Sequence, residues 1–60
     1  MQIRTLLVDD EPAARSRLRR LLARHPEVGI VGEAENGLEA LESIERLQPG
    51  LLFLDVEMPV

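Results

Sequence analysis

The sequence predicts an α/β fold in which three parallel strands alternate with two helices. Three short apolar runs, at residues 3–8, 28–34 and 51–54, have the length and composition of strands. In the two longer stretches between them, apolar residues recur every three or four positions, which is the period of a helix packed on one side. The resulting order β-α-β-α-β implies parallel strands joined by right-handed crossovers. With 60 residues in all, we expect a single domain.

The first strand and the first helix meet in the stretch LLVDDEP. Residues 3–8 (IRTLLV) form a nearly continuous apolar run, as expected for a strand buried on both faces. Pro12 suits the first turn of a helix, where its missing N–H is not needed, and Pro26 marks the end of that helix. The apolar face predicted for the helix consists of Ala14, Leu18, Leu21, Leu22 and His25.

The second helix has clear start and stop signals. Asn36 is the expected N-cap, and Glu39 three residues later forms a capping-box-like pair with it. Gln-Pro-Gly at 48–50 ends the helix. Gly29 and Gly32 weaken the strand prediction for 28–34, whereas the uniformly apolar run 51–54 is typical of a strand in the middle of a sheet. The apolar face predicted for this helix consists of Ala40, Leu41, Ile44 and Leu47.

Composition excludes several classes of function. The net charge of −4 argues against a surface for duplex DNA within these residues, and a single aromatic residue, Phe53, argues against a stacking platform for single strands. Without cysteine there is no disulfide or thiolate metal site, and no apolar run is long enough to cross a membrane. All seven basic residues are arginines, most of them on the first helix, where a solvated helix face is a simpler interpretation than a nucleic-acid patch.

Acidic residues follow two of the predicted strands. Asp9 and Asp10 come directly after the first strand, and Asp55 comes directly after the third. If the chain is doubly wound, the strand order is 2-1-3, and the first and third strands are neighbours at the edge where open α/β sheets bind ligands. Three carboxylates would then converge in one crevice. The simpler alternative, that each acid is a solvated loop residue, does not explain why two such junctions occur together.

Converging carboxylates need a cation or protons. Two unit charges about 4 Å apart repel by roughly 4 kcal/mol at an effective dielectric constant of 20. Because only oxygen ligands are available at these junctions, the site favours Mg²⁺ (or Mn²⁺) over zinc. A carboxylate beside such an ion is suited to accepting a phosphoryl group.

The motifs LLVDDEPAARSRLRRLL, GEAENGLEALE and FLDVEMP together resemble the first half of a response-regulator receiver domain, which has a doubly wound, flavodoxin-like fold. The first of them is more specifically similar to LytTR-type transcriptional regulators. The resemblance implies that Asp55 accepts a phosphoryl group from a sensor histidine kinase in a cytoplasmic two-component system. It also implies Mg²⁺ bound by Asp10, Asp55 and the backbone carbonyl of Glu57, with Asp9 assisting through water.

The resemblance also defines what to expect of the chain as a whole. We expect residues 1–60 to form a receiver domain truncated after the third strand, without enzymatic activity of its own, and to contact DNA only through an effector domain absent from this chain. The third strand becomes an edge in such a piece, and we expect it to self-associate. Two alternatives remain: a fragment of a haloacid-dehalogenase-like phosphatase, and an interaction half-domain that is not phosphorylated. The first leaves the acid pair unexplained and has Glu57 in place of its second aspartate.

Overall fold

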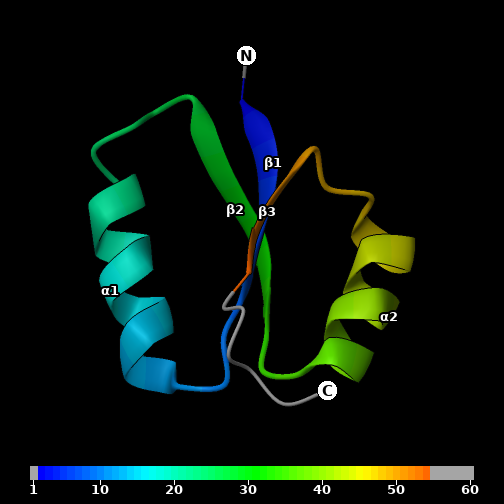
Figure 1. The fold of residues 1–60 in the computed structure, drawn as a ribbon. Helices are drawn as coiled ribbons and strands as arrows, with labels where there is room; N and C mark the ends of the chain where they lie inside the picture. Colours follow the sequence, from blue (N-terminus) through cyan, green and yellow to red (C-terminus); the bar gives the residue numbers. More distant parts are fainter. Residues whose placement is uncertain (1, 55–60) are drawn as a thin grey trace.

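A three-stranded parallel sheet lies between two helices, one on each face (Figure 1). The structure is a computed structural model and describes residues 2–54. The strand order is β2-β1-β3, so both the predicted β-α-β-α-β sequence of elements and the predicted order 2-1-3 are confirmed. The elements are β1 (Ile3–Val8), α1 (Pro12–Leu22), β2 (Val28–Ala34), α2 (Gly37–Leu47) and β3 (Leu51–Leu54).

Strand β1 is the centre of the core because it has a neighbouring strand on each side and a helix on each face. Its last four residues, 5–8, are all buried, whereas Ile3 and Arg4 at its start are exposed. Burial on both faces is therefore confirmed only for the second part of the strand. The Thr5 hydroxyl donates to the Ile3 carbonyl oxygen at 3.0 Å, so the polar group of this buried residue is satisfied within the strand.

The glycine at position 32 permits a close approach between β2 and α2. The pairing of β1 with β2 shifts register after Thr5, whose partner is Ile30, and resumes with Leu6 opposite Gly32. A Cβ atom on Gly32 would lie 2.8 Å from Cδ1 of Leu47, the last residue of α2. The two glycines that weakened the strand prediction are thus accommodated within β2, and one of them makes room for the helix.

Helix α1 packs on the sheet more loosely than its apolar pattern predicts. Pro12 is in the first turn, as expected, but the helix ends at Leu22, four positions before Pro26. Ala14, Leu18 and Leu22 are half-buried, whereas Leu21 and His25 are exposed. The prediction for these two residues was wrong for different reasons. Neighbouring residues point about 100° apart on a helix, so Leu21 points away from the sheet when Leu22 faces it. His25 lies beyond the end of the helix.

Helix α2 has the predicted N-cap. Oδ1 of Asn36 accepts from the Glu39 N–H at 2.8 Å, and Oε1 of Glu39 accepts from the Glu35 N–H at 3.1 Å. Ala40 is buried and Leu47 packs on the core, as predicted, but Leu41 is 67% exposed and Ser43 is buried in its place. The buried face of α2 is therefore rotated about the helix axis relative to the predicted apolar face.

The C-terminal end of α2 is held by the start of β1. Gln48 is the C-cap in a left-handed conformation, with φ 49° and ψ 60°. Nη2 of Arg4 donates to the Leu47 carbonyl at 2.5 Å, and the Gly50 N–H donates to the Arg4 carbonyl at 2.8 Å. These bonds satisfy a terminal carbonyl of the helix and lead the chain into β3.

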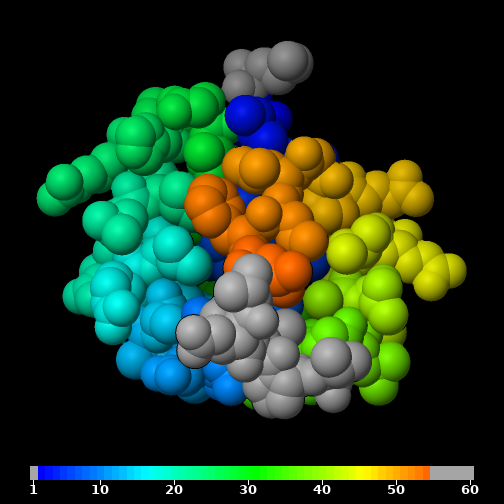
Figure 2. All heavy atoms as spheres, viewed as in Figure 1, coloured from blue at the N-terminus to red at the C-terminus, as the bar shows by residue number. Residues whose placement is uncertain are grey.

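Strand β3 is an edge strand among the described residues. It pairs only with β1 there, and its leucines Leu51, Leu52 and Leu54 are exposed. In Figure 2 orange atoms of this part of the chain are visible at the surface between the two helices. The prediction that the third strand is an edge within these residues is therefore confirmed, although its uniformly apolar pattern is the one typical of a strand with a neighbour on each side. Neither helix in residues 2–54 is long and apolar enough to cross a bilayer.

Candidate functional site

Three strands end together at one edge of the sheet. Val8 pairs with Ala34 on one side and with Leu54 on the other, so the last residues of all three strands are level. Asp9 and Asp10 leave this edge after β1. The other two predicted site residues, Asp55 and Glu57, lie outside the described residues. The described part of the site is therefore the junction between β1 and α1.

Asp9 is held in one position by its own backbone and side chain. Its N–H donates to the Ala34 carbonyl at 3.0 Å, which extends the ladder with β2 by one residue. Its Oδ1 accepts from the Glu11 N–H at 2.9 Å, an Asx turn that directs the chain toward Pro12. Asp9 is only 9% exposed, whereas Asp10 and Glu11 are exposed. The turn thus buries one carboxylate at the sheet edge and leaves the next one open to solvent.

The donor set at this junction suits a hard divalent cation. Its side chains offer only carboxylate oxygens, the ligands that Mg²⁺ prefers. Within residues 2–54, Oδ2 of Asp9 accepts no hydrogen bond, so it is available to a cation or to a bound water. No group of three acidic or histidine side chains in the described ranges is close enough to hold a metal ion. Asp9 and Asp10 supply carboxylates of the type that Mg²⁺ prefers, and within the described ranges they are not joined by a third such ligand.

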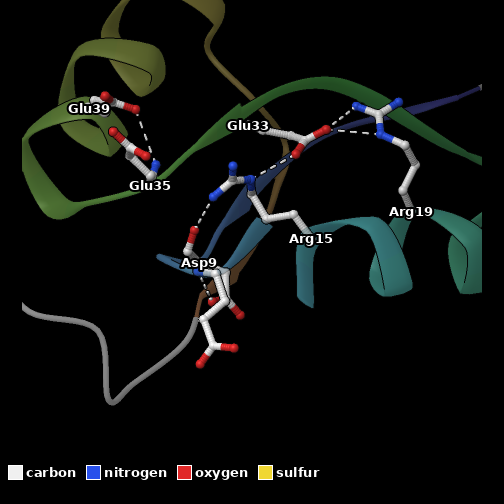
Figure 3. Close-up of polar contacts among 7 residues, drawn as sticks. Asp9, Arg15, Arg19, Glu33, Glu35 and Glu39 are labelled. Atoms are coloured by element: carbon white, nitrogen blue, oxygen red, sulfur yellow. Dashed lines mark hydrogen bonds and ion pairs between the residues drawn. The ribbon is translucent and has the colours of Figure 1, made fainter. Parts of the chain in front are cut away.

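Two arginines of α1 and one glutamate of β2 form an ion-pair network beside Asp9 (Figure 3). Nε of Arg15 lies 2.9 Å from Oε1 of Glu33, and Nε and Nη2 of Arg19 lie 2.9 and 2.5 Å from Oε2. Arg15 also donates from Nη1 to the Asp9 carbonyl oxygen at 2.5 Å. The hydrogen bond from Arg19, followed by that from Arg15, lowers the pKa of Glu33 against the opposing effect of desolvation. Glu33 is thus ionised at neutral pH.

The sequence prediction missed this network. Arg17, Arg20 and Arg24 are exposed, as expected for a solvated face, but Arg15 is half-buried and its side chain is 16% exposed. The spacing of Arg15 and Arg19, four residues apart, shows that the two share a helix face. Their partner is on a strand, so only the packing of α1 over β2 identifies it. His25, predicted to pack or to interact with the helix end, lies in solvent with Nδ1 3.4 Å from Oε1 of Glu27.

Comparison with known proteins agrees with the fold and the motifs. The sequence model of the response regulator receiver domain matches residues 5–60. The chain belongs to this family. The match covers the acid pair after β1, the capped helix α2 and the segment with Asp55 and Glu57. Because the chain belongs to the receiver family, the alternative interpretation as a fragment of a haloacid-dehalogenase-like phosphatase is excluded.

Curated relatives of this receiver chain carry two different kinds of name. The transcriptional regulatory protein BtsR is 49% identical over 57 residues in Salmonella typhi and 46% identical over 57 residues in Escherichia coli strain K12, in each case over 95% of this chain. A protein-glutamate methylesterase/protein-glutamine glutaminase of Alkalilimnicola ehrlichii is 42% identical over 59 residues, or 98% of the chain. The chain spans 24% of the length of the BtsR relatives and 15% of the methylesterase.

Proposed function

We propose that this receiver accepts a phosphoryl group from a sensor histidine kinase on Asp55. The observation that supports the proposal is the register between β1 and β3. Val8 pairs with Leu54, and the next residue in sequence after each is an aspartate, Asp9 or Asp55. Asp55 thus follows in sequence the residue that is level with Val8, at the sheet edge where α/β folds bind ligands.

We assign the Mg²⁺ ligands to Asp10, Asp55 and the backbone carbonyl of Glu57, with Asp9 assisting through water. A bound ion supplies positive charge that offsets the repulsion among the carboxylates and the phosphoryl oxygens. The protein's own contribution is geometric. Asp9 is fixed by the Ala34 carbonyl and the Glu11 N–H, so the exposed Asp10 starts from a defined backbone position. In the transfer itself, a carboxylate oxygen of Asp55 forms the new P–O bond as the P–N bond to the kinase histidine breaks.

The proposal also covers the wider setting of these residues. We place residues 1–60 in one receiver domain, of which they form the part through β3, and propose that they carry no catalytic activity toward an external substrate. Regulation of transcription, suggested by the BtsR relatives, would require a DNA-binding effector outside these residues. The similarity to LytTR-type regulators and a cytoplasmic location are part of this proposal, as is self-association through β3. Binding to a kinase without phosphorylation is the remaining alternative.

Phosphorylation at a single position tests the assignment of Asp55. In a protein that carries residues 1–60 within a complete receiver domain, incubation with acetyl phosphate and Mg²⁺ should add one phosphoryl group, measured by intact mass. Asp55→Asn should abolish the addition, and Asp10→Asn should slow it. Glu42→Gln, an exposed change on α2, is the control and should label at the normal rate. Labelling of the Asp55→Asn protein at Asp9 or Asp10 would show that the acceptor is misassigned.

Thermal melting tests the metal site separately. A ligand that binds only the folded state raises the melting temperature by mass action, so millimolar Mg²⁺ should stabilise the protein. Asp10→Asn should reduce this response, because it removes one of the assigned ligands. If the wild type and Asp10→Asn respond equally to Mg²⁺, Asp10 is not a ligand.

A further inference from the structure

Arg15 connects the acidic junction to the rest of the molecule. It lies one turn into α1, a helix that has no fully buried residue, yet its side chain is only 16% exposed. Its guanidinium makes two directed bonds, to Oε1 of Glu33 at 2.9 Å and to the Asp9 carbonyl at 2.5 Å (Figure 3). One rigid, planar group thus joins three elements: α1, β2 and the turn after β1.

The acceptor of the second bond matters for the site. The Asp9 carbonyl belongs to the peptide that joins Asp9 to Asp10, and its plane sets the direction in which the Asp10 backbone leaves the sheet. The Asp9 N–H and Oδ1 are already bonded, to Ala34 and Glu11. The bond from Arg15 holds a third group of Asp9, its backbone carbonyl oxygen. Together the three bonds fix both the buried carboxylate and the start of the exposed one.

The network also controls the position of Arg15 itself. Arg19 occupies the other carboxylate oxygen, Oε2, of Glu33 and so holds that carboxylate in place. Glu33 lies opposite Leu7 in the sheet, two residues before Asp9, on a strand whose backbone is fixed by its pairing with β1. The two arginines and one glutamate carry a net charge of +1, placed next to three consecutive acids. Arg15 therefore brings both geometry and a compensating charge to the junction.

We propose that Arg15 is a positioning residue for the acidic site, acting through its bond to the Asp9 carbonyl and held in place by Glu33 and Arg19. This inference deepens the proposed function and rests on it. Partners that orient metal ligands commonly change metal affinity by about tenfold or more when they are removed. We expect that lysine at position 15 does not reproduce this role, because an ammonium group lacks the planar fork of a guanidinium, which donates to both Glu33 and the Asp9 carbonyl.

The experiment compares Arg15→Gln and Arg15→Lys with a matched control, Arg17→Gln, each in a protein that carries residues 1–60 within a complete receiver domain. Arg17 is an exposed arginine of the same helix and makes no ion pair with the described residues. The first readout needs no metal: amide hydrogen exchange at Asp9 and Glu11, whose N–H groups donate to the Ala34 carbonyl and to Oδ1 of Asp9, followed by NMR in metal-free buffer. Both Arg15 variants should exchange several-fold faster there than the wild type, with unchanged exchange in the core of β1. Arg17→Gln should match the wild type.

The second readout is Mg²⁺ affinity, measured by NMR titration of the same amides. We expect about tenfold weaker binding for Arg15→Gln, with Arg15→Lys closer to Arg15→Gln than to the wild type. Wild-type exchange and affinity in Arg15→Gln would overturn the positioning role, and full recovery by lysine would show that charge alone matters. If the wild type binds no Mg²⁺, the proposed function fails, and the exchange measurement alone still decides whether Arg15 positions the turn.

Discussion

At the scale of single residues, Gln48 has a backbone conformation that glycine adopts more readily. Its φ of 49° makes it the one non-glycine residue with positive φ in the part of the chain that the structure describes. A left-handed conformation costs a residue with a Cβ about 1–2 kcal/mol, whereas glycine adopts it freely but loses more entropy on folding. The helix end is retained because Arg4 and the Gln48 N–H satisfy its carbonyls.

We expect Gln48→Gly to raise the free energy of unfolding by about 0.5–1 kcal/mol, since glycine is the usual residue at a left-handed helix end. Urea denaturation measures the change. The matched control is Ala23→Gly at the end of α1, where Ala23 has a right-handed conformation with φ −62°. That substitution should lower stability because no strain is relieved. An equal effect at both ends would contradict the explanation based on φ.

Glu33 gives the second prediction at this scale, a pH-dependent stability. Its pKa is lowered by Arg19 and then by Arg15, so its ion pairs stabilise the fold above the usual glutamate pKa, and this stabilisation is lost as pH falls through the folded-state pKa. Glu33→Gln should therefore be less stable than the wild type at pH 7. Exposed pairs of this kind contribute up to about 1 kcal/mol each.

The two proteins should become more alike in stability as pH is lowered below 4, or as salt is raised, in urea denaturation at each condition. Glu42→Gln is the control, because Glu42 is exposed and makes no ion pair with the described residues. A constant difference between Glu33→Gln and the wild type from pH 7 to pH 3 would mean that packing, and not charge, accounts for the contribution of Glu33.

At the scale of elements, the two helices start in different ways. Helix α2 has a side-chain cap, whereas Glu11 before α1 makes no capping bond and the preceding turn depends on Asp9 instead. Helix α1 therefore begins where the candidate site ends. Its position depends on the same bonds that hold Asp9, so changes at the site are expected to affect the start of this helix.

We expect Asn36→Ala to destabilise the protein by about 1 kcal/mol, because it leaves the Glu39 N–H without its acceptor. Asn36→Asp keeps an acceptor oxygen in the same place and adds a charge that favours a helix start, so it should retain most of the stability. Urea denaturation with helicity as the signal measures both variants. If aspartate is as damaging as alanine, the bond to Glu39 is not the cause.

At the scale of the whole molecule, a small core lies under a large apolar surface. The buried apolar residues are Leu6, Leu7, Val8, Ala34 and Ala40. An apolar groove of about 470 Å³ opens beside β3 and α2, and Leu41, Ile44, Leu52 and Leu54 line part of it. A domain of this size buries only about 60% of its unfolded surface, so its stability is small. An exposed apolar edge strand next to such a groove favours association.

We therefore expect the 60-residue chain to self-associate or precipitate at micromolar concentration. Leu52→Lys should reduce association in sedimentation experiments, because it places a charge on the exposed strand β3. Ser16→Lys adds the same charge to an exposed position of α1 and should leave association unchanged. A compact wild-type monomer at high concentration would contradict the prediction.

The residues alone predict the order of the elements, their bounds to within a few residues, the strand order 2-1-3 and the cap at Asn36, all of which the structure shows. These features depend on local signals: the period of apolar residues, Pro12 at a helix start, and an amide side chain three residues before Glu39. The apolar run 3–8 also placed Asp9 and Asp10 directly after the first strand, as observed. The roles of Asp55 and Glu57 stay predictions.

The sequence does not show which side chains of each helix are covered or which contacts hold the candidate site, because both depend on how the elements pack. Leu41 is exposed and Ser43 buried because the sheet covers only one part of α2, and a periodic pattern does not define the direction of that contact. The role of Arg15 depends on three segments far apart in sequence meeting at one guanidinium. Such contacts arise from packing between elements, so they cannot be predicted from the residue types of a single segment.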